Sequence, residues 1–344
     1  MNAQSKAVSA SRRGFTLVEL LVMIVIIGIL SSLVLGGLFV AQEKAKATRT
    51  RALVTRLNQA VMARMESYRT RRLPVSTSAA NQGVAAVSRR DMIRELMRME
   101  MPDRWTDVAD GAVTPGLPVG WRPALSTAYL RRYSNNVNEA GTAALPTELE
   151  QNAECLYLIV TMGGLDEEAS GLDRFRHEDV EDTDHDGAPE FVDGWGNPIR
   201  FLRWAPGFVS DLQPDSDPST VDDPSTPEVE DLDRDPINNH DPFDPLKTDM
   251  PAMGGAPRAF RLVPLIYSAG PDGVYDIRGD LVDSGGALFH YNATTPFPND
   301  PYHDPDPSQA PDNTRFIGGA FDFDADGLSH VDNIHNHLLG GAVR

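Results

Sequence analysis

The sequence predicts an α+β fold in which a long N-terminal helix packs on a small antiparallel sheet, with extra helices and long acidic loops. Three observations support this fold class. A segment without proline extends from Phe15 to the residue before Pro74. Stretches rich in β-branched and aromatic residues, which favour strands, come only later in the chain. Acidic, proline-rich segments separate those stretches.

The first half of the proline-free segment is apolar enough to cross a bilayer. From Leu20 to about Val40 it carries no charge, and about 20 residues of helix span the hydrocarbon core. We therefore expect a helix over residues 15–72 with a transmembrane part at about 17–40. Glu19 is the exception, because a carboxylate in lipid costs a few kcal/mol and usually has a partner.

The second half of the segment is amphipathic. Apolar residues at spacings of three and four form one stripe, opposite Arg51, Arg56 and Arg64. The stripe consists of Val54, Leu57, Val61, Met65 and Tyr68. We expect this half to cover a globular domain formed by residues 73–344.

Two further helices are expected in that domain. One is predicted over Ser88–Met101, with Ser88 as its cap. The other follows Pro146, where Thr147 and Glu150 have capping-box spacing, and it ends at Gly163-Gly164. Residues 156–160 could instead form a buried strand, and the pattern leaves both readings open.

Strand signals occur at residues 199–204 and 262–267, and Pro264 predicts that the second strand lies at a sheet edge. Between them is an acidic insertion at about 211–258. Residues 211–250 alone hold thirteen Asp/Glu, two Lys/Arg and seven Pro, a composition that cannot bury a core. Residues 294–312 look similar.

The charge distribution is strongly asymmetric. Residues 1–72 carry twelve Lys/Arg and three Glu, about +9, so the formal charge of −19 leaves −28 for the remainder. An acidic body argues against nucleic acid as a partner and suits cation binding or an extracytoplasmic location. The single cysteine, Cys155, cannot form an intramolecular disulfide, and its apolar neighbours predict a buried thiol.

Residues 182–193 have the spacing of a calcium-binding loop. Acids stand at positions one, three and five, glycine at six, and another acid at twelve. Alternate side chains in such a loop turn inward around a hard cation, and the glycine lets the backbone reverse. The candidate ligands are Asp182, Asp184, Asp186, Glu190 and Asp193, while a solvated acidic turn is the other reading.

A second copy of the pattern gives Asp322, Asp324 and Asp326 as candidate ligands before Gly327. Its ninth and twelfth positions are His330 and Asn333, so its closing ligand is open. A third run begins at Asp231 but has proline where the glycine should be, and we assign it to the acidic insertion.

Patterns for catalysis are lacking. The sequence has no nucleophile-elbow serine, phosphate-binding loop or helical His-Glu-x-x-His. Residues 335–337 (His-Asn-His) resemble part of a nuclease signature, but an acidic chain is a poor DNA binder. We expect surface or supporting roles for the eight histidines and predict that the protein is not an enzyme.

The stretch Arg12-Arg13-Gly14-Phe15-Thr16-Leu17-Val18-Glu19 resembles the cleavage and methylation signature of type IV pilin-like proteins. This resemblance implies a cytoplasmic leader at 1–14, cleavage after Gly14 by a prepilin peptidase and N-methylation of Phe15. It also implies a partner for Glu19, which would neutralise the new amino terminus of an adjacent subunit in a filament.

Parts of the body resemble the major pseudopilin of type II secretion. Residues 193–198 (Asp-Gly-Trp-Gly-Asn-Pro) are similar to its Asp-Pro-Trp-Gly-Asn-Pro turn, and residues 267–273 to its calcium-loop segment. That likeness implies Ser268, Asp272 and Asp276 as calcium ligands. The chain departs from the family in Gly194, which replaces a proline, and in its length, which is more than twice the usual one.

The resemblance implies a pilin or pseudopilin subunit that polymerises with like or different pilin-like subunits on an inner-membrane assembly platform. It would be a single-pass protein of the bacterial inner membrane with its C-terminal domain in the periplasm, and later part of a periplasmic or surface filament. Secretion, adhesion, motility and DNA uptake all stay open as roles. The alternative is a membrane-tethered calcium-binding or adhesive surface protein that uses the prepilin signal for export.

Overall fold

The structure is a computed structural model, and it divides into two compact units, residues 1–46 and 47–344. The residues that it describes are 15–73, 82–114, 117–163, 175–210, 212–213, 240–246, 248, 260–279, 301–302, 317–319 and 332–338. The mixture of one long helix, several further helices and small antiparallel sheets confirms the predicted α+β class.

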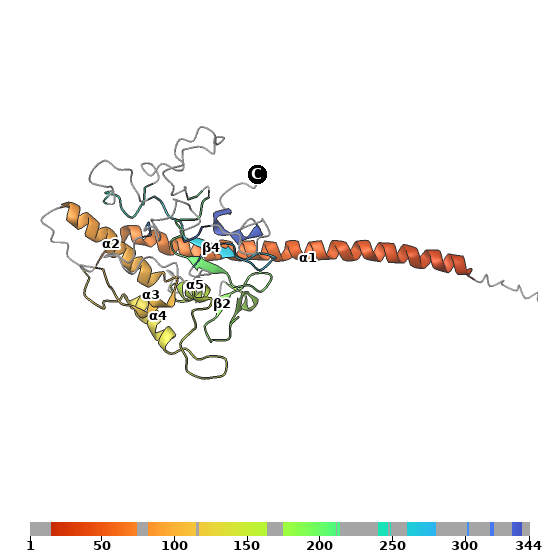
Figure 1. Ribbon diagram of the computed structural model, residues 1–344, viewed down its shortest axis with the longest axis horizontal. Coiled ribbons are helices and arrows are strands. Elements are labelled where there is room, and N and C mark those ends of the chain that lie inside the picture. The colour runs from red at the N-terminus through yellow and green to blue at the C-terminus, as the bar shows by residue number, and fades with distance from the viewer. Residues whose placement is uncertain are drawn as a thin grey trace, which may run out of the picture. The chain divides into compact units, whose positions relative to one another are not determined.

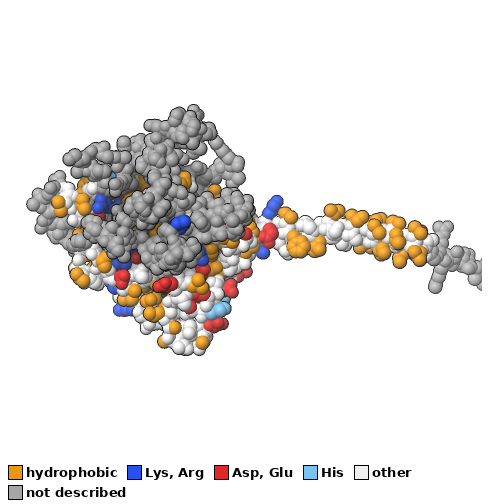
Figure 2. Space-filling model, viewed as in Figure 1, with side chains coloured by type: hydrophobic (Ala, Val, Ile, Leu, Met, Phe, Trp, Pro, Cys, Tyr) orange, Lys and Arg blue, Asp and Glu red, His pale blue; other side chains and the backbone are white. Residues whose placement is uncertain are grey.

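The first unit contains the N-terminal part of helix α1 (Leu17–Ser67). Large apolar side chains from Phe15 to Val40 are exposed in the free chain, and Figure 2 shows them along the visible face of this segment. By length and composition, the helix at 17–70 is the one helix in the described part of the chain that could span a membrane. Its most apolar window has a mean hydropathy of 2.8. The predicted transmembrane segment therefore has the required length and polarity.

In the second unit, the C-terminal part of α1 buries the predicted apolar stripe. Val54, Leu57 and Val61 have no exposed surface, and Met65 and Tyr68 are also buried. Full burial of such side chains contributes roughly 1.5–3 kcal/mol each. The prediction that Arg64 lies opposite the stripe was wrong, since Arg64 is buried and donates a hydrogen bond to the carbonyl of Gly163.

The described residues of this unit also form the helices α2 (Gln82–Glu100), α3 (Trp105–Ala109), α4 (Ala124–Ser134) and α5 (Gln151–Met162). Helices α3, α4 and α5 are neighbours (Figure 1). The prediction for α2 was correct in type but began too late, at Ser88. Helices α3 and α4 were not predicted. Short 3₁₀ turns are η1 (Tyr68–Thr70), η3 (His177–Asp179) and η6 (Asn336–Leu338).

Helix α5 confirms the helical reading of residues 156–160, but its start differs from the prediction. The N-cap is Glu150, which has a φ of 49° and makes no side-chain capping bond. Its carboxylate instead accepts two hydrogen bonds from Arg200, at 2.7 and 2.9 Å. The expected capping box between Thr147 and Glu150 therefore does not form, because the Glu150 carboxylate pairs with Arg200 instead.

The described part of this unit also contains two small antiparallel sheets. Strands β1 (Val180–Glu181) and β2 (Glu190–Phe191) pair with each other. Strands β3 (Arg200–Leu202), β4 (Leu265–Ser268) and β5 (Ile334–His335) form a sheet in the order β3-β4-β5. The edge position expected for β4 was wrong, because the strand starts just after Pro264 and pairs on both sides. The predicted acidic insertion lies mostly outside the described residues.

Candidate functional site

The first candidate site is the start of α1. The hydroxyl of Thr16 accepts a hydrogen bond from the backbone N–H of Glu19 at 3.2 Å. The Glu19 carboxylate accepts in return from the backbone N–H of Thr16 and from its hydroxyl, both at 2.9 Å. This is a capping box, so in the free chain Glu19 satisfies a helix N-terminus. Phe15, the predicted methylation site, immediately precedes it and is exposed; Gly14 lies outside the described residues.

The second candidate site is the acidic loop at 182–187. Asp182 accepts hydrogen bonds from the backbone N–H groups of Asp186 at 3.1 Å and Gly187 at 2.9 Å. Asp184 accepts from the Thr147 hydroxyl at 2.9 Å. Asp186 accepts from the N–H groups of Thr147 and Ala188. Alternate acidic side chains therefore point inward, as the sequence pattern predicted, and hold the loop in a tight turn.

Gly187 is required in this turn for two reasons. Its φ is +95°, and a Cβ there would lie 1.9 Å from the carbonyl oxygen of Val137. The segment that approaches so closely also clamps the loop, since Asn136 donates to the carbonyl of Asp186 at 2.7 Å. The loop is thus held from outside by the chain that follows α4.

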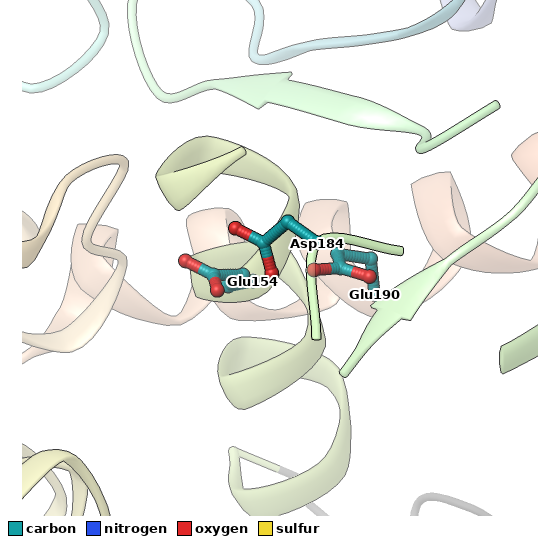
Figure 3. Close-up of side chains that lie close together, drawn as sticks. All are labelled: Glu154, Asp184 and Glu190. Atoms are coloured by element: carbon teal, nitrogen blue, oxygen red, sulfur yellow. The ribbon is translucent and has the colours of Figure 1, made fainter. Parts of the chain in front are cut away.

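Two groups of acidic side chains in the described part of the chain lie close enough to hold one metal ion. One is Asp182, Asp184 and Asp186 from the loop. The other joins Asp184 to Glu154 of α5 and Glu190 of β2, with one oxygen of each within 4.8 Å of the others. Figure 3 shows the Asp184 carboxylate between the two glutamates.

Burial makes this second group electrostatically unusual. Desolvation, and then the charges of Asp186, Glu190 and Asp184, raise the pKa of Glu154 to about 10. Desolvation and the neighbouring loop acids raise the pKa of Glu190 to about 8, against a bond from the Thr183 N–H that lowers it. Burial also raises the pKa of Asp184. Glu154 and Glu190 therefore need a proton or a cation at neutral pH.

Asp193, the predicted twelfth ligand of the loop, belongs to neither group. One of its oxygens accepts from the N–H groups of Trp195 and Asn197, at 2.8 and 2.9 Å. The other accepts from the Ser268 hydroxyl at 2.7 Å. Asp193 and Ser268 thus join the turn before β3 to the end of β4.

The other ligands implied by resemblance lie beyond β4. Asp272 caps its own turn through the N–H of Val274 at 2.9 Å, and Asp276 is buried with a φ of 47°. Burial, and then the charge of Asp272, raise the pKa of Asp332. The loop with Asp322, Asp324 and Asp326 lies outside the described residues.

Sequence reasoning missed Glu154 as a site residue. The signal was available, because Glu154 stands within the apolar run of α5 beside the buried Cys155. An acid on a helix that is buried on nearly every side needs a partner. Of the histidines expected to have surface or supporting roles, His335 and His337 are buried and do not lie on the surface.

Comparison with known proteins identifies the N-terminal segment only. Residues 9–35 match the family model of the prokaryotic N-terminal methylation motif. Together with the long apolar helix, this match fits a type IV pilin-like prepilin signature. No curated protein and no solved structure matches the chain. The signature indicates a membrane-anchored structural subunit of pilin-like or pseudopilin type rather than an enzyme.

Proposed function

We propose that the protein is a filament subunit of the type II secretion pseudopilus or of a type IV pilus-like fibre. A prepilin peptidase cleaves it after Gly14 and its new N-terminal Phe15 is methylated. The chain is held by its apolar helix in the inner membrane, with residues 73–344 on the periplasmic side. An inner-membrane platform then adds it to other pilin-like subunits.

The observation that carries this proposal is the combination of the methylation motif with Glu19 at the start of an apolar, exposed helix. A helix with apolar side chains on all sides is stable only in lipid or against other helices. Among the described residues, Glu19 forms no ion pair with a Lys, Arg or His. The amino terminus of an adjacent subunit supplies the missing positive charge in a helical bundle.

The capping box decides how the proposal is tested, because replacing Glu19 by alanine removes both the charge and a helix cap. Glu19→Gln removes the charge, and glutamine at this position can still cap the helix. Thr16→Ala removes the cap hydroxyl and leaves the charge; a lost cap costs about 1 kcal/mol of helix stability.

The measurement is filament incorporation after surface or periplasmic shearing, with the membrane-bound fraction as the control for insertion. We expect Glu19→Gln to abolish incorporation and to leave membrane insertion unchanged, while Thr16→Ala still assembles. Normal incorporation of Glu19→Gln would refute the filament role and favour a tethered surface protein. Loss in Thr16→Ala alone would show that Glu19 acts only as a cap.

A further inference from the structure

Three separate elements bring carboxylates to one buried point beside the acidic loop. Glu154 comes from α5, Asp184 from the loop and Glu190 from β2 (Figure 3). Glu154 is 1% exposed and Glu190 is fully buried. A cluster of acids on a surface is commonly solvated, but solvent cannot reach these two glutamates.

In each of the two glutamates, one carboxylate oxygen accepts a hydrogen bond and the other has no hydrogen-bond partner. Glu154 Oε2 accepts a hydrogen bond from the indole N–H of Trp105 at 2.8 Å, and Glu190 Oε2 accepts from the Thr183 N–H at 3.0 Å. Glu154 Oε1 and Glu190 Oε1 are buried and have no hydrogen-bond partner. Leaving a buried acceptor unsatisfied costs about 1–3 kcal/mol, and more when it is charged.

Among the described residues, these three carboxylates have no cationic side chain as an ion-pair partner. In the part of the chain that the structure describes, arginines pair with buried acids elsewhere, such as Arg71 with Glu100 at 2.8 Å, but no ion pair includes Glu154, Asp184 or Glu190. The site therefore differs from buried acids such as Glu100 and Asp179, which have arginine partners. Buried oxygens without a hydrogen-bond partner, in a group of three carboxylates that come within 4.8 Å of one another, suit a hard cation.

We propose that Glu154, Asp184 and Glu190 bind one Ca²⁺ and that this ion ties α5 to the loop and to β2. Calcium takes six to eight oxygen ligands in flexible geometry, so the three carboxylates, the adjoining Asp182 and water suffice. Mg²⁺ fits less well, because it keeps most of its water and demands octahedral geometry. This ligand set differs from the one that the sequence pattern of residues 182–193 predicted. It includes Glu154 of α5 and does not include Asp193.

The consequence is structural. Cys155, the next residue after Glu154, is fully buried, so its thiol can react only when the surrounding structure opens. A cation that holds α5 in place must suppress the opening that exposes this thiol. Because Cys155 is the only cysteine of the chain, its labelling reports on α5 alone. This inference does not depend on filament assembly.

The test uses the full chain in non-ionic detergent after removal of divalent ions with a chelator. Equilibrium dialysis with radioactive calcium counts bound ions, and N-ethylmaleimide labelling of Cys155 measures opening. Glu154→Gln and Asp184→Asn remove ligand charge, and Glu148→Gln is the matched control because Glu148 is exposed and outside the site. Asp184 is only half-buried, so its substitution does not threaten the core.

We expect the wild type and Glu148→Gln to bind one Ca²⁺ more per chain than Glu154→Gln and Asp184→Asn do. Saturating Ca²⁺ should slow Cys155 labelling about tenfold or more in the wild type and in Glu148→Gln. In the two site variants it should change the rate less than about twofold. Equal ion counts and equal protection in wild type and Glu154→Gln would overturn the proposal, as would a rate in the wild type that Ca²⁺ does not change.

Discussion

Arg203 lies at the centre of a buried charge network that can be tested by one substitution. Its guanidinium donates to Asp107 and to the carbonyl of Met101, both at 2.8 Å, and lies 3.5 Å from Asp103. The network holds three acids and three bases, each at most 6% exposed: Glu95, Asp103, Asp107, Arg98, Arg104 and Arg203. It is therefore electrically neutral as a whole.

The substitution Arg203→Met keeps much of the side-chain volume and removes one positive charge. Burial alone would raise the pKa of Asp107, but the charges of Arg203, Arg104 and Arg98 outweigh it and hold that pKa well below the usual range. Without Arg203 the network keeps three acids against two bases. Breaking a buried pair in this way costs about 3–5 kcal/mol, since a buried charge is left uncompensated.

Labelling of Cys155 in detergent measures this loss in the full chain. If opening equilibrates before labelling, a loss of about 3 kcal/mol raises the labelling rate more than about 100-fold. The control is Arg176→Met, because Arg176 pairs with Glu178 at 3.1 Å while both side chains are mostly exposed. Such a surface pair contributes at most about 1 kcal/mol. Equal labelling rates in the two variants would refute the claim that buried charge balance stabilises this unit.

Two further predictions concern local features. Burial lowers the pKa of His337 to about 4. Between about pH 6.5 and 4, His337 is therefore protonated in the unfolded chain but not in the folded chain. The free energy of unfolding of the wild type should therefore fall by up to about 3 kcal/mol between pH 6.5 and 4. The urea midpoint of His337→Phe should fall less than that of the wild type over the same pH range. Equal decreases in the two proteins would contradict this prediction. Gly187→Ala should lower the free energy of unfolding, measured with urea, by about 2–4 kcal/mol, because its Cβ would clash with the backbone at a residue whose φ is already unfavourable for alanine. Gly196→Ala has the same φ of +95° but open space around its Cβ, so a cost above about 2 kcal/mol there would show that the clash is irrelevant.

The features that the sequence predicted correctly depend on local periodicity. The stripe from Val54 to Tyr68 repeats at helical spacing, and each of its residues is buried. Strand β3 lies within its predicted segment and β4 overlaps its own, extending one residue beyond it, because their β-branched and aromatic residues are consecutive. Such signals need no knowledge of the rest of the chain.

The features that were missed depend on contacts between distant residues. Glu150 has capping-box spacing from Thr147, yet it pairs with Arg200, fifty positions away. Thr147 in turn donates to Asp184. Helix α4 has two adjacent arginines and no side-chain cap, so its sequence carries little helical signal. For Glu150 and Thr147, a long-range partner that a local window of sequence does not include decides the structure.

The two candidate sites present the same physical problem in different surroundings. Glu19 and Glu154 are both acids on apolar helices, and in the described residues neither has an ion-pair partner. Glu19 is exposed and capped by Thr16, so its charge becomes costly only when lipid or other helices surround it. Glu154 is buried within its own unit, so its charge is costly as soon as that unit folds. Glu19 therefore needs a partner that arrives at assembly, such as the amino terminus of another subunit, whereas Glu154 needs one that is present at folding, such as a cation. The two proposals predict separable defects: Glu154→Gln should change cation binding and thiol protection, and Glu19→Gln should change neither.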